Sequence, residues 1–134
     1  MTKQAARRCF AAARVARLAT VDAHTQPHLV PIVFALAGET IYSVVDAKPK
    51  RTTELRRVQN VSANPRASVL VDHYDDADWG ALWWVRADGR ARVLSLDEPE
   101  AGGALELLAQ RYPQQRAIGP VLAIDVERWT GWSA

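Results

Sequence analysis

Hydrophobic and polar residues alternate with a period of two over much of this chain, and only short stretches show helical spacing. Alternation of this kind predicts half-buried strands, and the six segments that carry it are residues 17–21, 28–36, 40–45, 67–72, 81–94 and 121–129. Helical spacing predicts short helices at residues 2–14, 52–60 and 97 to about 112. Because hairpin-type connections dominate the first half, the pattern predicts a mainly β protein with short helices and an antiparallel, barrel-like sheet.

Three positions refine this pattern. Pro31 cannot donate a backbone hydrogen bond, so we expect an edge segment or a bulge within the strand at 28–36. Gly89 is the natural site for a bend or bulge in the long strand at 81–94. Cys9 lies on the apolar side of the first helix, where we expect a small buried hydrophobic residue rather than a nucleophile.

The composition limits the classes of function. A chain of 134 residues predicts a single domain over residues 1–134. A net charge of +2 with scattered basic residues does not favour nucleic-acid binding. The N-terminal segment lacks the apolar stretch of a secretory leader, and no apolar run approaches the roughly 18 residues of a membrane helix. We therefore expect a cytoplasmic protein without membrane or nucleic-acid partners.

Familiar catalytic and metal-binding motifs are missing from the sequence. The seven glycines are scattered and form neither a dinucleotide-binding fingerprint nor a P-loop. No G-x-S-x-G is present and Cys9 has no evident partner base, so nucleophilic hydrolysis has no support. His73 and the aspartates around it offer ligands for a divalent ion, but a solvated acidic loop is the favoured interpretation. The sequence thus predicts no metal site and indicates no catalytic residue.

A basic turn follows the segment at 40–45. Lys48, Lys50 and Arg51 lie together there, and they include two of only three lysines among 17 basic residues. Cations and backbone donors between a strand and a helix can bind a phosphate or a carboxylate. A solvated turn is the commoner meaning of such a run, and the turn alone does not decide between the two.

The five tryptophans all lie in the second half of the chain. In a regular strand at 81–94, Trp84 shares one face with Arg86 and further charged residues, whereas Trp83 points to the core side. A tryptophan among arginines indicates a solvated face, a subunit interface or the wall of a site for a planar anionic ligand. We favour the interface or the site, because tryptophan is costly to leave in water.

Several short motifs, in order, carry a resemblance to a known family. They are Ala16–Val21 (ARLATV), Pro27–Ile32 (PHLVPI), Tyr42–Val45 (YSVV) with the lysines of the basic turn, Asn64–Arg66 (NPR) and Trp84–Ala91 (WVRADGRA). Together they cover nearly the whole chain, which resembles the flavin/deazaflavin split-barrel superfamily, also called pyridoxamine-5'-phosphate-oxidase-like. Within it, the chain is most similar to the actinobacterial branch of probable oxidoreductases that use the deazaflavin F420.

The resemblance implies a six-stranded split barrel and a two-fold homodimer with its sites at the subunit interface. It assigns cofactor contacts by position. Ser43, Lys48 and Lys50 match the phosphate-binding positions, with Arg51 and Thr52 close enough to assist. Val30, Pro31 and Ile32 match the segment along the ring. Trp84, Arg86, Trp129 and Trp132 are candidates for a wall that the partner subunit contributes.

The resemblance also implies a function. Relatives that bind FMN commonly carry an additional arginine and a lysine on or near the second strand, and residues 26–39 contain neither. This departure favours F420 over FMN, and it implies hydride transfer between the deazaflavin and a small electron-poor organic substrate. An FMN-binding oxidoreductase, or a non-catalytic carrier of a flavin or haem, are the alternatives. The substrate is not indicated, and the proton donor is left open between water and a nearby residue such as Tyr42.

Overall fold

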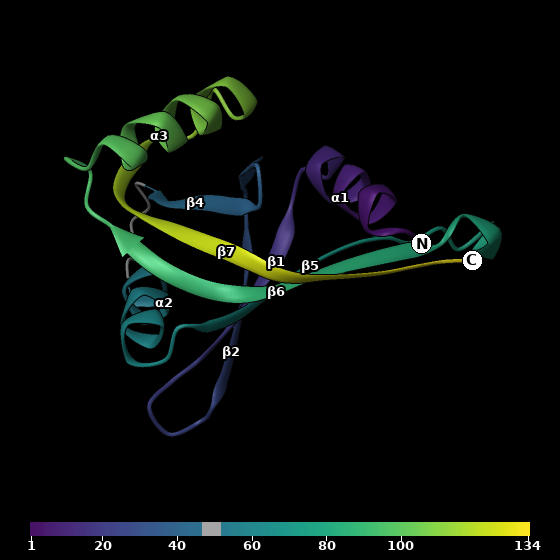
Figure 1. The fold of residues 1–134 in the computed structure, drawn as a ribbon, viewed down its shortest axis with the longest axis horizontal. Helices are drawn as coiled ribbons and strands as arrows, with labels where there is room; N and C mark the ends of the chain where they lie inside the picture. Colours follow the sequence, from purple (N-terminus) through teal and green to yellow (C-terminus); the bar gives the residue numbers. More distant parts are fainter. Residues whose placement is uncertain (47–51) are drawn as a thin grey trace.

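The computed structural model describes residues 1–46 and 52–134, which form a seven-stranded antiparallel sheet, three α-helices and one short 3₁₀ helix (Figure 1). In chain order the elements are α1 (Lys3–Ala12), β1 (Ala16–Val21), β2 (Pro27–Ile32), β3 (Ala35–Ala37), β4 (Thr40–Asp46), α2 (Thr52–Ala63), β5 (Arg66–His73), η1 (Trp79–Ala81), β6 (Trp83–Leu94), α3 (Pro99–Arg111) and β7 (Ala117–Ser133). The prediction of a mainly β protein with short helices is confirmed.

The order of strands in the sheet is β2-β1-β5-β6-β7-β4-β3, so β2 and β3 lie at opposite edges. In the chain, however, these two strands are joined only by Val33 and Phe34. A link of that length spans at most about 11 Å. The sheet must therefore curl until its two edges approach each other at this link, which produces a barrel that is split between β2 and β3.

The split corrects one prediction. The segment at 28–36 was expected to be a single strand of a six-stranded barrel, but it forms parts of two strands, which makes seven in the described residues. The physical reason is a change of partner: β2 pairs with β1, whereas β3 pairs with β4. At the change, the Phe34 side chain turns fully into the core, and the backbone leaves the ladder that Pro31 had already weakened.

Aromatic and branched side chains fill the barrel. Phe10 of α1 packs on Phe34 with 4.9 Å between ring centroids, and on Trp129 of β7 edge-on at 5.1 Å. Inward-facing residues of the strands complete the cluster; they include Leu18, Val30, Val69, Val71, Val85 and Ala87. Cys9 is partly buried against this core, as its place on the helix predicted.

The predicted irregularity at Gly89 is confirmed, and its cause lies on the neighbouring strand. Asp88 pairs with Arg128 and Gly89 with Val126, so Glu127 is an extra residue in β7. A Cβ at Gly89 would lie 2.1 Å from the backbone oxygen of Asp125. Only glycine lets the two strands approach this closely at the bulge.

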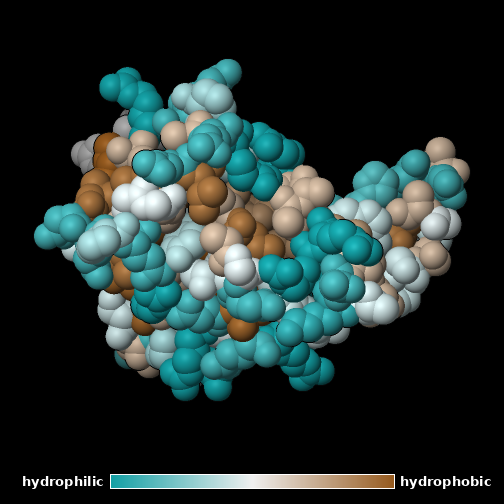
Figure 2. Space-filling model, turned by 45° about the horizontal axis from the view of Figure 1, so that its top comes forward, coloured by the Kyte–Doolittle hydropathy of each residue, from teal (hydrophilic) through white to brown (hydrophobic). Residues whose placement is uncertain are grey.

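Helix α3 forms a second layer over β4 and β7 (Figure 1). Ala101, Ala104 and Leu108 bury its inner side against Tyr42 and other residues of the strands. On the other side of the molecule, the ends of β5, β6 and β7 extend with η1 and both termini into a narrow projection, the arm (Figures 1 and 2). None of the helices in the described part of the chain has the length and apolar character needed to cross a bilayer.

Candidate functional site

A cavity of about 500 Å³ lies between the end of β2, strand β4, helix α2 and the turn after α3. Its lining brings together residues from distant parts of the chain: Val15, Pro31, Ile32, Val33, Ser43, Val44, Arg57, Tyr112, Gln114 and Gln115. Three of the residues predicted to bind a cofactor, Pro31, Ile32 and Ser43, are among them. We call this space the β2–β4 cavity.

The strands determine what this cavity presents. Pro31 is exposed on the outer face of β2, and Ile32, which follows it, is buried. Ser43 lies opposite Leu122 in the β4–β7 ladder and is 2% exposed. The result is an apolar wall with a hydroxyl group set into it.

Arg57 supplies a positive charge to the same cavity and was not predicted from the sequence. It is 8% exposed on α2. The helix is fixed to β1 by a buried hydrogen bond in which Asn60 Nδ2 donates to Thr20 Oγ1 at 3.1 Å. Arg57 precedes Asn60 and the buried Val61 by three and four residues, so all three share a face of the helix. An arginine at an inward-facing helical position was the signal available in the sequence.

The turn after α3 contributes the remaining polar groups, which sequence reasoning also missed. Tyr112 ends the helix, and its carbonyl accepts a hydrogen bond of 3.0 Å from the backbone N–H of Gln115. Tyr112, Gln114 and Gln115 all line the cavity. Their local sequence does not predict that they lie near the sheet, because their position depends on how α3 packs on the strands.

Two residues predicted to contact the cofactor have their side chains in other contacts within the chain. The Val30 side chain is buried in the barrel core. Trp129 packs on Phe10, and its indole Nε1 donates a hydrogen bond of 2.7 Å to Glu39 Oε2. That bond, followed by the charges of Arg7 and Lys3, holds the pKa of the Glu39 carboxyl below its usual value. Neither residue lines the β2–β4 cavity.

The basic turn lies outside the described residues. Lys48, Lys50 and Arg51 belong to residues 47–51, and the side chain of Thr52 is likewise not described. Their assignment to a phosphate or carboxylate group remains a prediction from the sequence.

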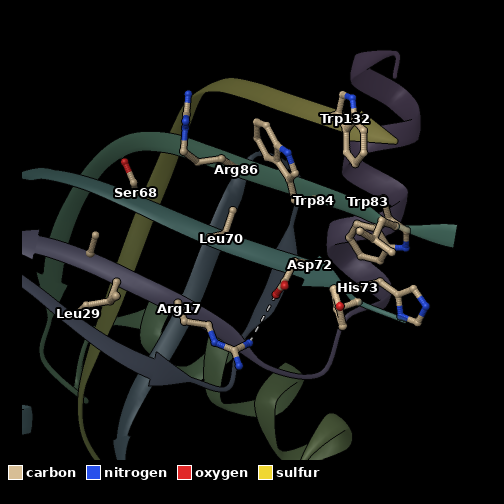
Figure 3. Close-up of a pocket in the computed structure, with 13 residues that line it drawn as sticks. Arg17, Leu29, Ser68, Leu70, Asp72, His73, Trp83, Trp84, Arg86 and Trp132 are labelled. Atoms are coloured by element: carbon tan, nitrogen blue, oxygen red, sulfur yellow. Dashed lines mark ion pairs between the residues drawn. The ribbon is translucent and has the colours of Figure 1, made fainter. Parts of the chain in front are cut away.

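The other predicted residues lie in a second, more apolar hollow, which we call the tryptophan groove (Figure 3). It has a volume of about 610 Å³ and runs over the outer face of the sheet; its lining is Arg17, Ala19, Leu29, Ser68, Leu70, Asp72, His73, Tyr74, Leu82, Trp83, Trp84, Arg86 and Trp132. Trp84, Arg86 and Trp132 thus lie together, in a hollow distinct from that of Ser43; their role as a wall contributed by a partner subunit remains a prediction from the sequence.

Charged groups in the tryptophan groove are held by neighbours. Arg86 Nε donates to Asp88 Oδ2 at 3.0 Å, and the Arg86 guanidinium lies 5.9 Å from the centroid of the Trp84 ring. Arg17 and Asp72 form an ion pair of 4.0 Å (Figure 3). Apolar side chains of the groove remain accessible, since Leu29 is 68% exposed and Trp132 46%. The alternation predicted for residues 84–92 is confirmed, because Val85, Ala87 and Ala91 face the core.

Strand β2 connects the two hollows. Leu29 lines the tryptophan groove and Pro31 lines the β2–β4 cavity. Both are exposed residues on the outer face of the same strand, two positions apart. A molecule that covers the groove along β2 therefore reaches the mouth of the cavity.

The acidic loop before η1 uses its carboxylates locally. Asp75 accepts from the N–H of Ala77 at 2.9 Å, Asp78 from that of Gly80 at 3.0 Å, and Asp76 from the Tyr74 hydroxyl at 2.9 Å. In the part of the chain that the structure describes, no group of three or more histidine, cysteine or acidic residues is placed to hold a metal ion.

Tyr42 lies away from both hollows. Its hydroxyl donates a 2.7 Å hydrogen bond to Glu100 Oε2, under α3. Burial first, and the nearby Glu100 second, raise the pKa of Tyr42 to about 12. The structure therefore gives no support to Tyr42 as a proton donor at the site.

The family of the chain follows from comparison with known proteins. A family model described as pyridoxamine 5'-phosphate oxidase matches residues 2–133. The chain belongs to the pyridoxamine 5'-phosphate oxidase family. The superfamily predicted from the sequence motifs is thereby confirmed, together with the split-barrel type of fold. No match was found among curated proteins.

Solved structures agree at the level of the fold of this family. A FAD-binding protein from Mesorhizobium loti has a TM-score of 0.76 and 22% identity, covering 98% of this chain and 94% of that one. The haem storage protein HutZ from Vibrio cholerae has a TM-score of 0.72 and 16% identity, with coverage of 98% and 93%. A FAD-binding protein from Mycobacterium smegmatis has a TM-score of 0.67 and 17% identity, with coverage of 100% and 97%.

Proposed function

We propose that this member of the family is an oxidoreductase that binds F420 in the β2–β4 cavity and transfers a hydride between it and a small electron-poor organic substrate. One observation carries the proposal. The cavity joins the ring-facing segment at Pro31 and Ile32 with the predicted anchor Ser43, and adds the cation Arg57. These residues come from three elements that only the folded barrel brings together.

The donor set fits a planar ring with an anionic tail. Proline, isoleucine and valine side chains form a surface against which a ring can stack, and the Ser43 hydroxyl and Arg57 guanidinium donate hydrogen bonds to oxyanions. Residues 31–33 carry no cation, which favours the diffuse anionic tail of F420 over the compact phosphate of FMN. When bound, a deazaflavin supplies the hydride chemistry. The role of the chain is to hold the tail, orient the ring and exclude water on one side.

We further propose that a second copy of the chain completes the site. The tryptophan groove is apolar and accessible, and β2 joins it to the mouth of the cavity. A two-fold partner seated on this groove brings Trp84, Arg86 and Trp132 towards the cavity of the other subunit. This arrangement also accounts for the exposed Leu29 and Trp132, which are costly in a monomer.

Binding distinguishes the cofactors. The purified chain is titrated separately with F420 and with FMN, following ligand fluorescence, and Ser43→Ala is titrated in parallel with Ser62→Ala, a serine on the exposed side of α2. We expect tighter binding of F420, weakened by the change at Ser43 and not by that at Ser62. Protein that purifies yellow and prefers FMN would instead establish the FMN-dependent alternative, which the FAD-binding proteins of the same fold favour.

Turnover distinguishes an enzyme from a carrier. Reduced F420 is mixed with the protein and a panel of enones, quinones and biliverdin, and its oxidation is followed by absorbance. Oxidation that depends on protein and acceptor supports the proposal. Tight binding without oxidation, or a haem absorption band in the purified protein, would favour a carrier, as the haem storage protein of the same fold suggests.

A further inference from the structure

Three segments that are distant in sequence meet at the hydroxyl group of Tyr112. The Oη atom lies 2.9 Å from the carbonyl oxygen of Arg14 and 3.0 Å from that of Phe34, and the backbone N–H of Phe34 donates to it at 3.4 Å. The single hydroxyl proton can be donated to one of the two carbonyl oxygens at a time, while the hydroxyl oxygen accepts from the Phe34 N–H. A single group thus ties the end of α3 to the link after α1 and to the link between β2 and β3.

Neighbouring arginines fix the tyrosine itself. Arg111 donates from Nη1 to Ala11 O at 2.7 Å and from Nη2 to Ala13 O at 2.6 Å, which holds the end of α3 against the end of α1. The Arg14 guanidinium lies over the Tyr112 ring, 4.7 Å from its centroid. The ring therefore has little freedom to swing away from Phe34.

The link between β2 and β3, which contains Phe34, is the point at which the barrel splits. The Phe34 ring is fully buried against Phe10, so the side chain anchors the link from inside the barrel, and Tyr112 holds its backbone from outside. The residues immediately before it, Pro31, Ile32 and Val33, form the apolar wall of the β2–β4 cavity. The turn that begins at Tyr112 carries Gln115, which lines the same cavity.

We propose that Tyr112 is a positioning residue for this cavity: its hydroxyl fixes the β2–β3 link, and so the distance between the Pro31–Val33 wall and the turn after α3. The proposal deepens the proposed function, since it assigns the residue that shapes the cofactor-binding wall. Loss of the hydroxyl loosens the wall without removing any group that contacts the anionic tail.

The test compares Tyr112→Phe with Tyr42→Phe in the full-length chain. Each change removes one hydroxyl that is hydrogen-bonded in the structure, but Tyr42 bonds to Glu100 under α3, away from the cavity. Three quantities are measured: amide hydrogen exchange of peptides covering residues 31–36, the Kd for F420 and FMN, and the melting temperature. For Tyr112→Phe we expect faster exchange at the link and a Kd raised about fivefold, the scale of one hydrogen bond. Tyr42→Phe should leave both near the wild-type values, because Arg92 still holds Glu100 of α3 through two hydrogen bonds.

Each contrary result has a separate meaning. Unchanged exchange and affinity in Tyr112→Phe, or equal effects of both variants, would overturn the positioning role. If the wild-type chain binds neither cofactor, the proposed function fails, but hydrogen exchange still decides whether Tyr112 fixes the link. Should Tyr112→Phe not fold, the wild-type protein decides: the Phe34 amide must exchange as slowly as those of β3, and a fast Phe34 amide would refute the proposal.

Discussion

Arg57 brings a positive charge to the wall of the β2–β4 cavity, whose lining also includes apolar residues of β2 and β4. The residue is 8% exposed and forms part of the cavity lining. Next to it in sequence, Arg56 is exposed on the same helix. The pair therefore offers a comparison of two equal charges, one in the cavity wall and one at the surface.

We expect Arg57→Gln to weaken binding of an anionic cofactor by about 1.5–3 kcal/mol, the usual value of a charge-assisted hydrogen bond. Arg56→Gln should change it by less than about 0.5 kcal/mol, because an exposed charge is screened by solvent. Titration of both variants with F420, alongside their melting temperatures, measures the difference. Equal losses in the two variants would show that only the overall charge of the region matters.

At the scale of elements, the β6–β7 ladder is the longest pairing in the sheet, and it bends at the bulge opposite Gly89. Gly89→Ala places a Cβ against the backbone of Asp125, which cannot move without breaking the ladder. We expect a loss of about 2–3 kcal/mol in the free energy of unfolding.

Gly103→Ala is the matched control for that change. Gly103 lies within α3, and a Cβ there meets no atom within 4 Å. Alanine is the better helix former, so this variant should gain about 0.5–1 kcal/mol. Urea denaturation of both proteins gives the two values. Similar effects of the two substitutions would contradict the close approach at the bulge.

Helix α3 is fixed to the sheet by a polar cluster centred on Arg92. The guanidinium donates to Asp125 Oδ2 at 2.7 Å and to both carboxylate oxygens of Glu100 at 2.7 and 2.8 Å, and Tyr42 donates to the same Glu100. Hydrogen bonds from Arg92 are the main reason that the pKa values of Glu100 and Asp125 lie below their ordinary values of 4.5 and 3.8. The cluster thus favours ionised carboxylates and a neutral tyrosine.

The cluster therefore makes the free energy of unfolding fall at both acid and alkaline pH. The carboxylates stabilise the fold fully above pH 4.5, and that contribution is lost as the pH falls through their lowered pKa values. Neutral Tyr42 stabilises it fully below pH 10, and its contribution is lost as the pH rises towards 12. Glu100→Gln should reduce the loss of unfolding free energy at acid pH, and Tyr42→Phe should reduce the loss at alkaline pH. Glu106→Gln, at an exposed position of α3, should alter neither. Denaturation curves from pH 3 to 11 test this. If stability varies with pH in the same way in all these variants, the cluster does not contribute to the pH dependence.

For the whole molecule, local pattern predicted most elements because alternation and helical spacing reflect one buried face. It did not predict the division of residues 28–36 between β2 and β3, since a change of strand partner depends on pairing with β1 and β4 rather than on the segment itself. The same limit applies to the site. Ser43 and Pro31 were found through motif resemblance, whereas Tyr112 and Gln115 reach the cavity only through the docking of α3.

The tryptophan groove yields the prediction for the assembly. Leu29 is 68% exposed, so Leu29→Glu costs the isolated subunit little, but it places a charge in a proposed apolar interface. Leu96→Glu is the control, because Leu96 is 44% exposed and lies outside the groove. Sedimentation should give the wild type and Leu96→Glu twice the 14.8 kDa of one chain and Leu29→Glu that of a monomer.

Cofactor affinity should follow the assembly state, because the partner's tryptophan groove is proposed to complete each β2–β4 cavity. Leu29→Glu should therefore lose binding of F420 although none of the groups that hold the tail is altered, and binding by the wild type should weaken on dilution below the dimer dissociation constant. A monomeric Leu29→Glu that binds as tightly as the wild type would mean that one chain forms the whole site. A wild type that is monomeric at all concentrations would remove the second copy from the proposal and leave the exposed groove for another ligand.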